Sequence, residues 1–245
     1  MSPPSGAILG GRRAALEAVR AGNARELLVA EGSSPTAAFR ELLEACRERG
    51  VRVVEVPRHR LDALAPDHRG VLVRLQPPPV LGEREVASWP FGENDIVVVL
   101  DGIVDPQNLG AAARSAEAAG AAMLVTRLRR AAAPSPAATR ASSGALLHLP
   151  HARVANITRT LGRLKDGGFW VVGLDQKAHE TVYDERCPRG RVAVVLGSEG
   201  EGLSRLVREA CDQLLSLPMR GRVGSLNASA ALAAVLYAYV LPSRR

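Results

Sequence analysis

The residues that decide the fold begin as Asp95-Ile96-Val97-Val98-Val99-Leu100 and continue, after four further residues, as Asp105-Pro106-Gln107-Asn108-Leu109-Gly110. The first run is apolar almost throughout, which is typical of a strand buried on both faces of a parallel sheet. The second run is a turn that leads into a helical pattern over Asn108–Ala119. The order strand, turn, helix predicts the first unit of an open α/β sheet.

Two further turns of this kind occur later in the chain. They read Leu196-Gly197-Ser198-Glu199-Gly200-Glu201-Gly202-Leu203 and Leu217-Pro218-Met219-Arg220-Gly221-Arg222-Val223-Gly224-Ser225-Leu226-Asn227-Ala228-Ser229. Each follows a strand-like run and precedes a helix-like run, so we expect all three turns to converge at one edge of the sheet, where α/β proteins bind ligands. They contain few titratable groups and many backbone amides, which suits a neutral, nucleoside-like ligand better than hydrolytic chemistry.

The remaining segments of the second half alternate between strand and helix patterns. We expect strands at Ala122–Thr126, Phe169–Leu174, Val192–Leu196 and Gln213–Leu217, and helices at Pro136–Leu147, Ile157–Lys165, Leu203–Ala210 and Ser225–Tyr239. The last helix is apolar nearly all round. It should therefore be buried on more than one side, both by the sheet and by a second subunit.

Residues 1–76 form a smaller α/β pattern of their own. The expected helices are Gly11–Ala21, Pro35–Arg49 and Arg58–Leu64, and the expected strands are Glu26–Ala30, Val51–Val56 and Gly70–Leu75. The run Gln76-Pro77-Pro78-Pro79 ends this pattern, and no period is visible from there to Asn94. We therefore expect a linker over 77–94 and a second domain over 95–245.

The charge balance favours a polyanionic partner. The chain of 245 residues carries a formal net charge of +7, and Lys165 and Lys177 are the only lysines among its 32 basic residues. Arginine binds phosphate through two hydrogen bonds and stacks on bases, which fits RNA. A GC-rich genome would explain the choice of arginine over lysine, but it would not explain the sign of the net charge.

Several other classes of protein are disfavoured. Cys46, Cys187 and Cys211 lie far apart and form no CxxC pair, so neither a disulfide framework nor a zinc site is indicated. No run reaches the roughly 18 apolar residues of a membrane span. The first residues do not resemble a signal peptide. We therefore expect a cytoplasmic protein without a membrane anchor or a bound metal.

A phosphate-binding loop is also a poor explanation of the second turn. Gly197, Gly200 and Gly202 give the spacing GxxGxG rather than GxGxxG, and no Gly-Lys-Ser/Thr follows. Glu199 and Glu201 would repel a pyrophosphate. The chain contains no Gly-x-Ser-x-Gly elbow, and its five histidines are scattered; His148 and His151 are expected in a surface loop.

Each polar residue of the turns also has a purely structural explanation. Asn108 could cap a helix, with Arg114 and Glu117 as a surface ion pair. Glu199 could be a carboxylate that the start of a helix favours, and Ser225 a plain N-cap. Spacing alone leaves these alternatives open.

Taken together, the three turns resemble the SpoU/TrmH family of RNA 2′-O-ribose methyltransferases, in the SPOUT superfamily. Asp105–Gly110 with Arg114 matches the first family motif, Val195–Leu203 the second, and Leu217–Met219 with Ser225–Ser229 the third. The resemblance covers about residues 95–240. One departure is Ala228, where the family usually has a β-branched residue.

A second set of residues resembles one branch of this family. Arg140–Ala145 and Phe169–Asp175 are similar to members that methylate a guanosine of large-subunit ribosomal RNA. Those members also carry an N-terminal RNA-binding domain with a ribosomal-protein-like α/β/α fold, and residues 1–76 are compatible with it. The resemblance leaves open transfer RNA or an antibiotic-site nucleotide as the target. A catalytically silent RNA-binding protein is the alternative from another class.

The resemblance implies a deep trefoil knot formed by the C-terminal segment, with S-adenosylmethionine bent inside it and a homodimer partner completing the site. By analogy, the residues that hold the cofactor are Gly197, Leu217 and Leu226, with Met219 and Ser225 nearby. No metal is implied. The RNA partner would be 23S ribosomal RNA.

The same resemblance assigns the catalytic residues. Arg114 would be either the base for the ribose hydroxyl or the anchor of a neighbouring phosphate, because an arginine pKa above about 12 makes it an unusual base. Asn108 would orient Arg114 and the ribose, and Glu199 would fix Asn108 or the target nucleotide. Ser225 and Asn227 would hold the third turn.

Overall fold

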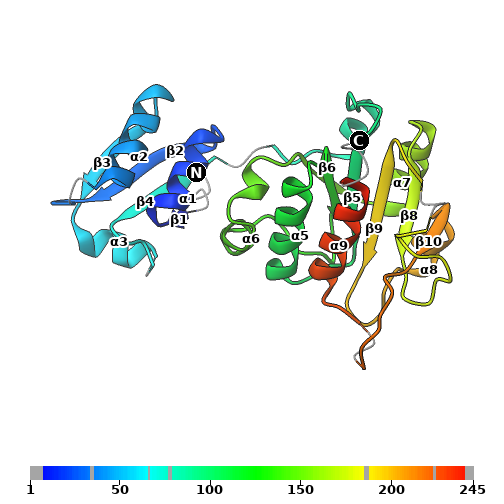
Figure 1. Ribbon diagram of the computed structural model, residues 1–245. Helices are drawn as coiled ribbons and strands as arrows, with labels where there is room; N and C mark the ends of the chain where they lie inside the picture. The colour runs from blue at the N-terminus through cyan, green and yellow to red at the C-terminus, as the bar shows by residue number, and fades with distance from the viewer. Residues whose placement is uncertain are drawn as a thin grey trace.

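The chain folds into two α/β lobes, each built on its own sheet (Figure 1). The computed structural model describes residues 8–33, 36–65, 67–76, 79–184, 188–222 and 225–240. Expectations that fall on Pro35, Pro77, Pro78, Cys187 and Gly224 lie outside these described residues. No helix of the described ranges is long and apolar enough to cross a membrane.

The N-terminal lobe has a four-stranded sheet in the order β1-β4-β2-β3. The strands are β1 (Ile8–Gly10), β2 (Ala24–Ala30), β3 (Arg52–Val56) and β4 (Val71–Leu75), and the helices are α1 (Arg12–Arg20), α2 (Ala37–Glu48) and α3 (Arg58–Leu64). Leu27 and Val29 share a core with α1 and α2, whereas Leu28 and Ala30 share another with α3. Alternate residues of β2 therefore face opposite layers, as an α/β/α arrangement requires.

The second lobe has a six-stranded sheet in the order β10-β8-β9-β5-β6-β7, and all of its ladders between these strands are parallel. Its strands are β5 (Ile96–Asp101), β6 (Met123–Arg127), β7 (His151–Val154), β8 (Trp170–Leu174), β9 (Val192–Gly197) and β10 (Gln213–Leu215). All six residues of β5 are buried. The prediction of a central strand with two covered faces is confirmed.

Helices cover both faces of this second sheet. One layer contains α5 (Pro106–Ala118), α6 (Pro136–Ala141) and α9 (Ala228–Val240), and the other contains α4 (Glu83–Ser88), α7 (Ile157–Asp166) and α8 (Arg205–Glu209). In β5, Val98 packs with the first layer and Val97 with the second. The lobe is therefore the three-layered α/β domain that the sequence predicts.

The helix expected over 136–147 is wrong in its second half. Helix α6 ends at Ala141, and a 3-10 turn, η1 (Ala145–Leu147), follows. Between them Ser143 and Gly144 have φ values of 52° and 93°, in the left-handed region. The Ser142 hydroxyl donates to the Thr139 carbonyl at 2.9 Å and accepts from the Leu146 amide at 3.3 Å. Local bonds of this kind compete with helix continuation.

Strand β7 was not expected, and His151 does not lie in a surface loop. It is 5% exposed, and its Nε2 lies 2.8 Å from the Thr126 hydroxyl. Burial, reinforced by the charge of Arg153, lowers the pKa of His151 to about 4. The strand has only four residues, and two of them are His and Arg, so it lacks a readable apolar period.

No helix was expected within residues 77–94, yet α4 lies there and packs on α7. Leu81 exchanges backbone hydrogen bonds with β7, at 2.9 Å to the His151 carbonyl and 2.8 Å from the Arg153 amide. Glu83 forms an ion pair with Arg159 at 2.5 Å. These contacts attach the segment from Leu81 onward to the second lobe.

Candidate functional site

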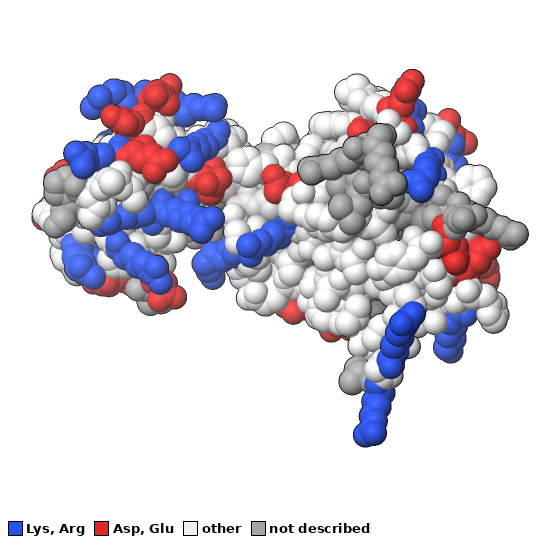
Figure 2. All heavy atoms as spheres, in the orientation of Figure 1, with Lys and Arg blue, Asp and Glu red and all other residues white. Residues whose placement is uncertain are grey.

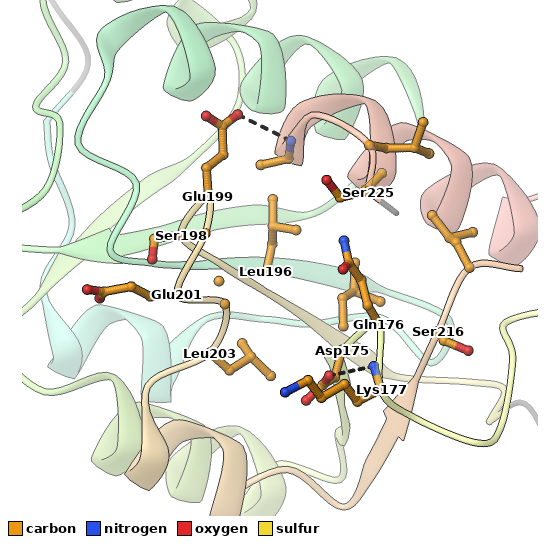
Figure 3. Close-up of a pocket in the computed structure, with 18 of the residues that line it drawn as sticks. Asp175, Gln176, Lys177, Leu196, Ser198, Glu199, Glu201, Leu203, Ser216 and Ser225 are labelled. Atoms are coloured by element: carbon orange, nitrogen blue, oxygen red, sulfur yellow. Dashed lines mark hydrogen bonds between the residues drawn. The ribbon is translucent and has the colours of Figure 1, made fainter. Parts of the chain in front are cut away.

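A pocket of about 660 Å³ opens at the carboxyl ends of β8, β9 and β10 (Figure 3). Its walls are the turn after β9, the segment after β10, the residues that lead into α9, and the residues Leu174 to Lys177 after β8. The second and third turns of the sequence therefore meet at one edge of the sheet. The volume is in the range of small-molecule sites.

All five residues predicted to hold a cofactor line this pocket. They are Gly197, Leu217, Met219, Ser225 and Leu226. Met219 and Leu226 are 38% and 44% exposed. Both side chains lie at the pocket wall, where they could pack against an apolar part of a ligand.

Gly197 lets the second turn fold back on itself. A Cβ atom at this position would lie 2.1 Å from the carbonyl carbon of Gly202, so any side chain here would force the turn to move. Ser198 and Gly202 exchange backbone hydrogen bonds at 3.0 Å each, and Gly200 and Gly202 adopt positive φ angles. A side chain at Gly197 would therefore push against the turn's own backbone, and glycine lets this turn stay closed beside the pocket.

Asn108, Glu199 and Asn227 form a hydrogen-bonded cluster, which we call the amide–carboxylate cluster. The Oε1 atom of Glu199 accepts from Asn108 Nδ2 at 3.2 Å and from Asn227 Nδ2 at 2.6 Å. It also accepts from the backbone amide of Ala228 at 3.5 Å, the bond drawn in Figure 3. Asn227 Nδ2 further donates to Asn108 Oδ1 at 3.2 Å. One carboxylate oxygen therefore joins all three turns.

The N-cap roles considered for Asn108 and Ser225 are wrong. The cap of α5 is Asp105, whose Oδ1 accepts from the Gln107 amide at 3.0 Å, so Asn108 is free for the cluster. Ser225 is not the N-cap residue of α9, because that helix begins at Ala228. Asn227 instead accepts from the Ser229 amide and hydroxyl at 3.0 and 2.6 Å.

Arg114 lies apart from the cluster. It is exposed on α5, does not line the pocket, and forms no hydrogen bond or ion pair within the described part of the chain. Six residues correspond to about 600° of helical rotation, which is about 240° beyond one full turn. Arg114 and Asn108 therefore face different directions. The ion pair with Glu117, which the structural alternative required, and the contact with Asn108, which the resemblance implied, are both absent among the described residues.

Sequence reasoning missed two charged pairs that support the pocket. Asp101, which is 3% exposed, accepts from Arg127 Nε and from the Ser204 amide, each at 2.8 Å. This interaction fixes the end of the second turn to β5. Asp175 forms an ion pair with Arg208 at the pocket wall. A carboxylate directly after an apolar strand was the available signal for Asp101.

Neither described cysteine is a nucleophile at neutral pH. Burial raises the pKa of Cys211 to about 12 and that of Cys46 to about 11, so both thiols stay protonated. The described ranges hold no group of three His, Cys, Asp or Glu side chains that could bind a metal ion. The pocket offers backbone groups, amides and apolar side chains, with the charged side chains of Lys177 and Glu201 at its wall, which suits binding and positioning of a ligand.

Two family models match the chain. The model of the SpoU rRNA Methylase family matches residues 95–237, and the model described as RNA 2′-O ribose methyltransferase substrate binding matches residues 8–81. The first match spans the second lobe with its pocket, and the second spans the N-terminal lobe.

Curated relatives and a solved structure agree with these matches. An uncharacterized tRNA/rRNA methyltransferase of Mycolicibacterium vanbaalenii is 41% identical over 238 residues, covering 94% of this chain and 74% of the relative. The 23S rRNA (guanosine-2′-O-)-methyltransferase RlmB of Photobacterium profundum is 38% identical over 199 residues, covering 80% and 81%. The crystal structure of the SpoU methyltransferase AviRb from Streptomyces viridochromogenes, in complex with AdoMet, superposes with a TM-score of 0.80 at 28% identity, covering 97% and 90%.

Proposed function

Because the chain belongs to the SpoU rRNA Methylase family of S-adenosylmethionine-dependent RNA methyltransferases, we propose that it methylates a ribose 2′-oxygen, that of a guanosine in 23S ribosomal RNA. The observation that carries the proposal is the pocket whose walls join the second and third turns, with the amide–carboxylate cluster at its edge. The similarity to a guanosine-2′-O-methyltransferase over 80% of the chain supports the choice of target.

The residues of the pocket fit the cofactor. Gly197, Leu217 and Leu226 would bind it through backbone groups, and Met219 and Ser225 would lie beside it. The tight turn that Gly197 permits, which leaves backbone rather than a side chain along the pocket wall, is the feature that suits an adenosine-like group. When bound, S-adenosylmethionine supplies a methyl group on a sulfonium. The exposed apolar side chains of Met219 and Leu226 would then exclude water from that group.

The chain must also orient the ribose hydroxyl and accept its proton. Orientation of this kind contributes roughly 7–11 kcal/mol to well-positioned reactions. We assign it to Asn108 and Asn227, which Glu199 holds in place. Arg114 either accepts the proton or binds the neighbouring phosphate, and a guanidinium suits the second task better because its pKa exceeds about 12. No step requires a metal ion.

Arg114 would come from a second copy of the chain. It does not line the pocket of its own chain, so one chain alone lacks the assigned base or phosphate anchor. Helix α9 consists of Ala, Ser, Leu, Val and Tyr only, and Tyr237 on it is 43% exposed. This composition favours a homodimer in which two lobes of this kind pack together. We propose further that the C-terminal segment is threaded as a trefoil knot, which the entry of the third turn into the same pocket as the second supports.

RNA would be held by both lobes. We propose residues 1–76 as the substrate-binding domain, 77–94 as the connection, and 95–245 as the methyltransferase domain. Figure 2 shows Lys and Arg side chains over much of the visible face of the N-terminal lobe, interspersed with Asp and Glu. This face suits a phosphate backbone better than it suits a neutral partner.

The function is tested by methyl transfer. The purified protein is incubated with radiolabelled S-adenosylmethionine and ribosomal RNA that lacks this modification, and the RNA is digested to nucleosides. Label in 2′-O-methylguanosine of the large RNA is expected. Label in transfer RNA would instead identify transfer RNA as the target, an alternative that the name of the Mycolicibacterium relative leaves open. No label in any RNA, with cofactor binding intact, would favour the silent RNA-binding protein.

The shared site is tested by mixing two inactive variants. Arg114→Ala should abolish transfer but leave the affinity for S-adenosylmethionine within about twofold, since Arg114 contacts nothing in the pocket. Gly197→Val should abolish cofactor binding. If the two are unfolded and refolded together, mixed dimers contain one intact site, and activity should return. Full activity of Arg114→Ala alone, or no recovery in mixed dimers of normal size, contradicts the assignment.

A further inference from the structure

The two lobes meet at η1, which inserts into the core of the N-terminal lobe. Leu147 belongs to the second lobe by sequence, yet it is 5% exposed and forms one apolar cluster with α1, α2, β2 and β4. Its burial removes a full leucine side chain from water on the N-terminal lobe's side of the junction. The junction is therefore a packed contact rather than two surfaces that merely touch.

Asn23 completes the socket around η1. Its side chain, in a residue that is 7% exposed, donates from Nδ2 to the Leu147 carbonyl at 2.6 Å. Its backbone donates to Ala18 at 3.0 Å and accepts from Gln76 at 2.6 Å. One buried asparagine thus connects α1, the end of β4 and η1. At the rim, Glu17 lies 3.7 Å from His148, a weaker and more exposed contact.

The other side of η1 is fixed to the helix that carries Asn108 and Arg114. A Cβ at Gly110 would lie 2.5 Å from both the Ala138 carbonyl oxygen and the Ala141 Cβ, so α5 and α6 touch backbone to backbone. The Ser142 hydroxyl then joins the last turn of α6 to Leu146. Packed contacts therefore run without a gap from Asn23 through η1 and α6 to α5.

The covalent connection alone would not orient the lobes. Gln76 is anchored to Asn23, and Leu81 is anchored to β7, so five Cα steps span the gap. An extended chain of that length reaches at most about 18 Å. The connection limits how far the lobes can separate, but it leaves their relative rotation free. Orientation must come from noncovalent contacts, which η1 makes with the N-terminal core and α6 makes with β1.

We propose that η1 and the socket formed by Asn23 are a fixed joint, in which Leu147 and Asn23 act as positioning residues for methyl transfer. The joint holds the N-terminal lobe in one orientation relative to α5, so that RNA bound by that lobe presents its target ribose at the pocket. This inference rests on the proposed function. Opening the joint leaves RNA tethered but misdirected, so turnover falls while binding of both substrates persists.

The test compares two variants of Leu147 and one control variant elsewhere in the N-terminal lobe with the wild-type full chain. Leu147→Asp places a charge in the socket. Leu147→Met conserves side-chain volume and should behave as wild type. Leu64→Asp is the matched control: Leu64 lies on α3, against the opposite face of the N-terminal sheet, and is 43% exposed. Small-angle X-ray scattering, calorimetry with S-adenosylmethionine, and kcat and KM on unmodified ribosomal RNA are measured for each.

Leu147→Asp is expected to increase the radius of gyration and to keep the cofactor Kd within about twofold. Its kcat should fall by about tenfold or more while KM changes far less, because positioning rather than binding is lost. A merely structural role would reduce the folded fraction instead, and the stoichiometry of S-adenosylmethionine binding would then fall in the same proportion as kcat. If Leu147→Asp does not fold, Asn23→Ala, which removes the only donor to the Leu147 carbonyl among the described residues, takes its place.

Two results would overturn the joint. One is unchanged scattering in both Leu147→Asp and Asn23→Ala, which would mean that other contacts hold the lobes. The other is a clear opening of the lobes with wild-type kcat. If the wild-type protein labels no RNA, the proposed function and the positioning role fail together, while the scattering comparison still decides whether the joint exists.

Discussion

Replacing Gly197 by alanine is the sharpest test of the pocket, because its effect follows from distances alone. The new Cβ would lie 2.1 Å from the Gly202 carbonyl carbon, 2.2 Å from its oxygen and 2.3 Å from the Leu203 amide nitrogen. Non-bonded carbon atoms settle at about 3.5–4.0 Å. The second turn must therefore move by more than about 1 Å, and all three obstructing atoms are backbone.

The displacement should affect catalysis more than folding. A misplacement of about 1 Å can reduce turnover about 100-fold, which corresponds to about 2.7 kcal/mol of transition-state stabilisation. Overpacking of this kind costs about 1–3 kcal/mol of stability, and each kcal/mol lowers the Tm of a chain of this size by about 2–4 °C. We expect a folded protein whose affinity for S-adenosylmethionine is reduced about tenfold or more.

Two other glycines provide controls. Gly200 lies in the same turn with φ +86°, and no atom lies within 4 Å of the position that a Cβ would take, so Gly200→Ala adds strain without a clash. Gly162 lies inside α7 with open space around it, so Gly162→Ala should stabilise the helix by about 0.5–1 kcal/mol. Calorimetry and methyl transfer at one temperature separate the three variants. Wild-type cofactor affinity and turnover in Gly197→Ala would refute the argument that this turn holds the cofactor.

The remaining predictions concern the cluster and the buried histidine. Asn108→Ala and Asn227→Ala should each lower kcat/KM about tenfold or more, since hydrogen bonds to charged groups contribute about 1.5–3 kcal/mol, and the double variant should lose less than the product; strictly multiplicative losses would mean that the two do not act through Glu199. Burial and Arg153 lower the pKa of His151 to about 4, against about 6.5 in the unfolded chain. The unfolded chain takes up the proton first, so stability from this group is complete above pH 6.5 and falls by about 3 kcal/mol as the pH approaches 4. Urea unfolding at pH 7 and pH 4.5 should show a smaller loss in His151→Gln than in wild type, and equal losses would contradict the assignment.

The elements with strong local patterns could be predicted from the sequence. Strand β5 and helix α5 were expected within one or two residues of their observed bounds, because a run of buried Val and Ile followed by a Pro-Gln-Asn turn has few alternatives. The pocket-lining turns were found for the same reason. The helix start expected at Asn108 lies two residues too late, and Asp105 followed by Pro106 at the first helical position is the stronger start signal.

The elements without such patterns could not be predicted. Strand β7 and helix α4 are short, and nonlocal contacts define them. Strand β7 pairs with β6, where Leu124 lies opposite His151, and Glu83 of α4 bonds to Arg159 of α7. In the sequence, Leu147 is indistinguishable from the other apolar positions of the helix expected over 136–147. Its partners in the N-terminal core lie more than 70 positions earlier in the chain, so no local period reports its role.

The charges around the pocket explain why glycine and amide patterns predicted the site better than titratable residues did. Asp101 is occupied by Arg127 and the Ser204 amide, and Asp175 by Arg208. One carboxylate oxygen of Glu199 accepts hydrogen bonds from two asparagine amides and a backbone amide. Each carboxylate thus holds a strand end or a turn in place. What remains for a ligand is backbone, neutral side chains and the charged side chains of Lys177 and Glu201, so much of the selectivity of this pocket has to come from the shape of the turns, and that shape depends on these internal bonds.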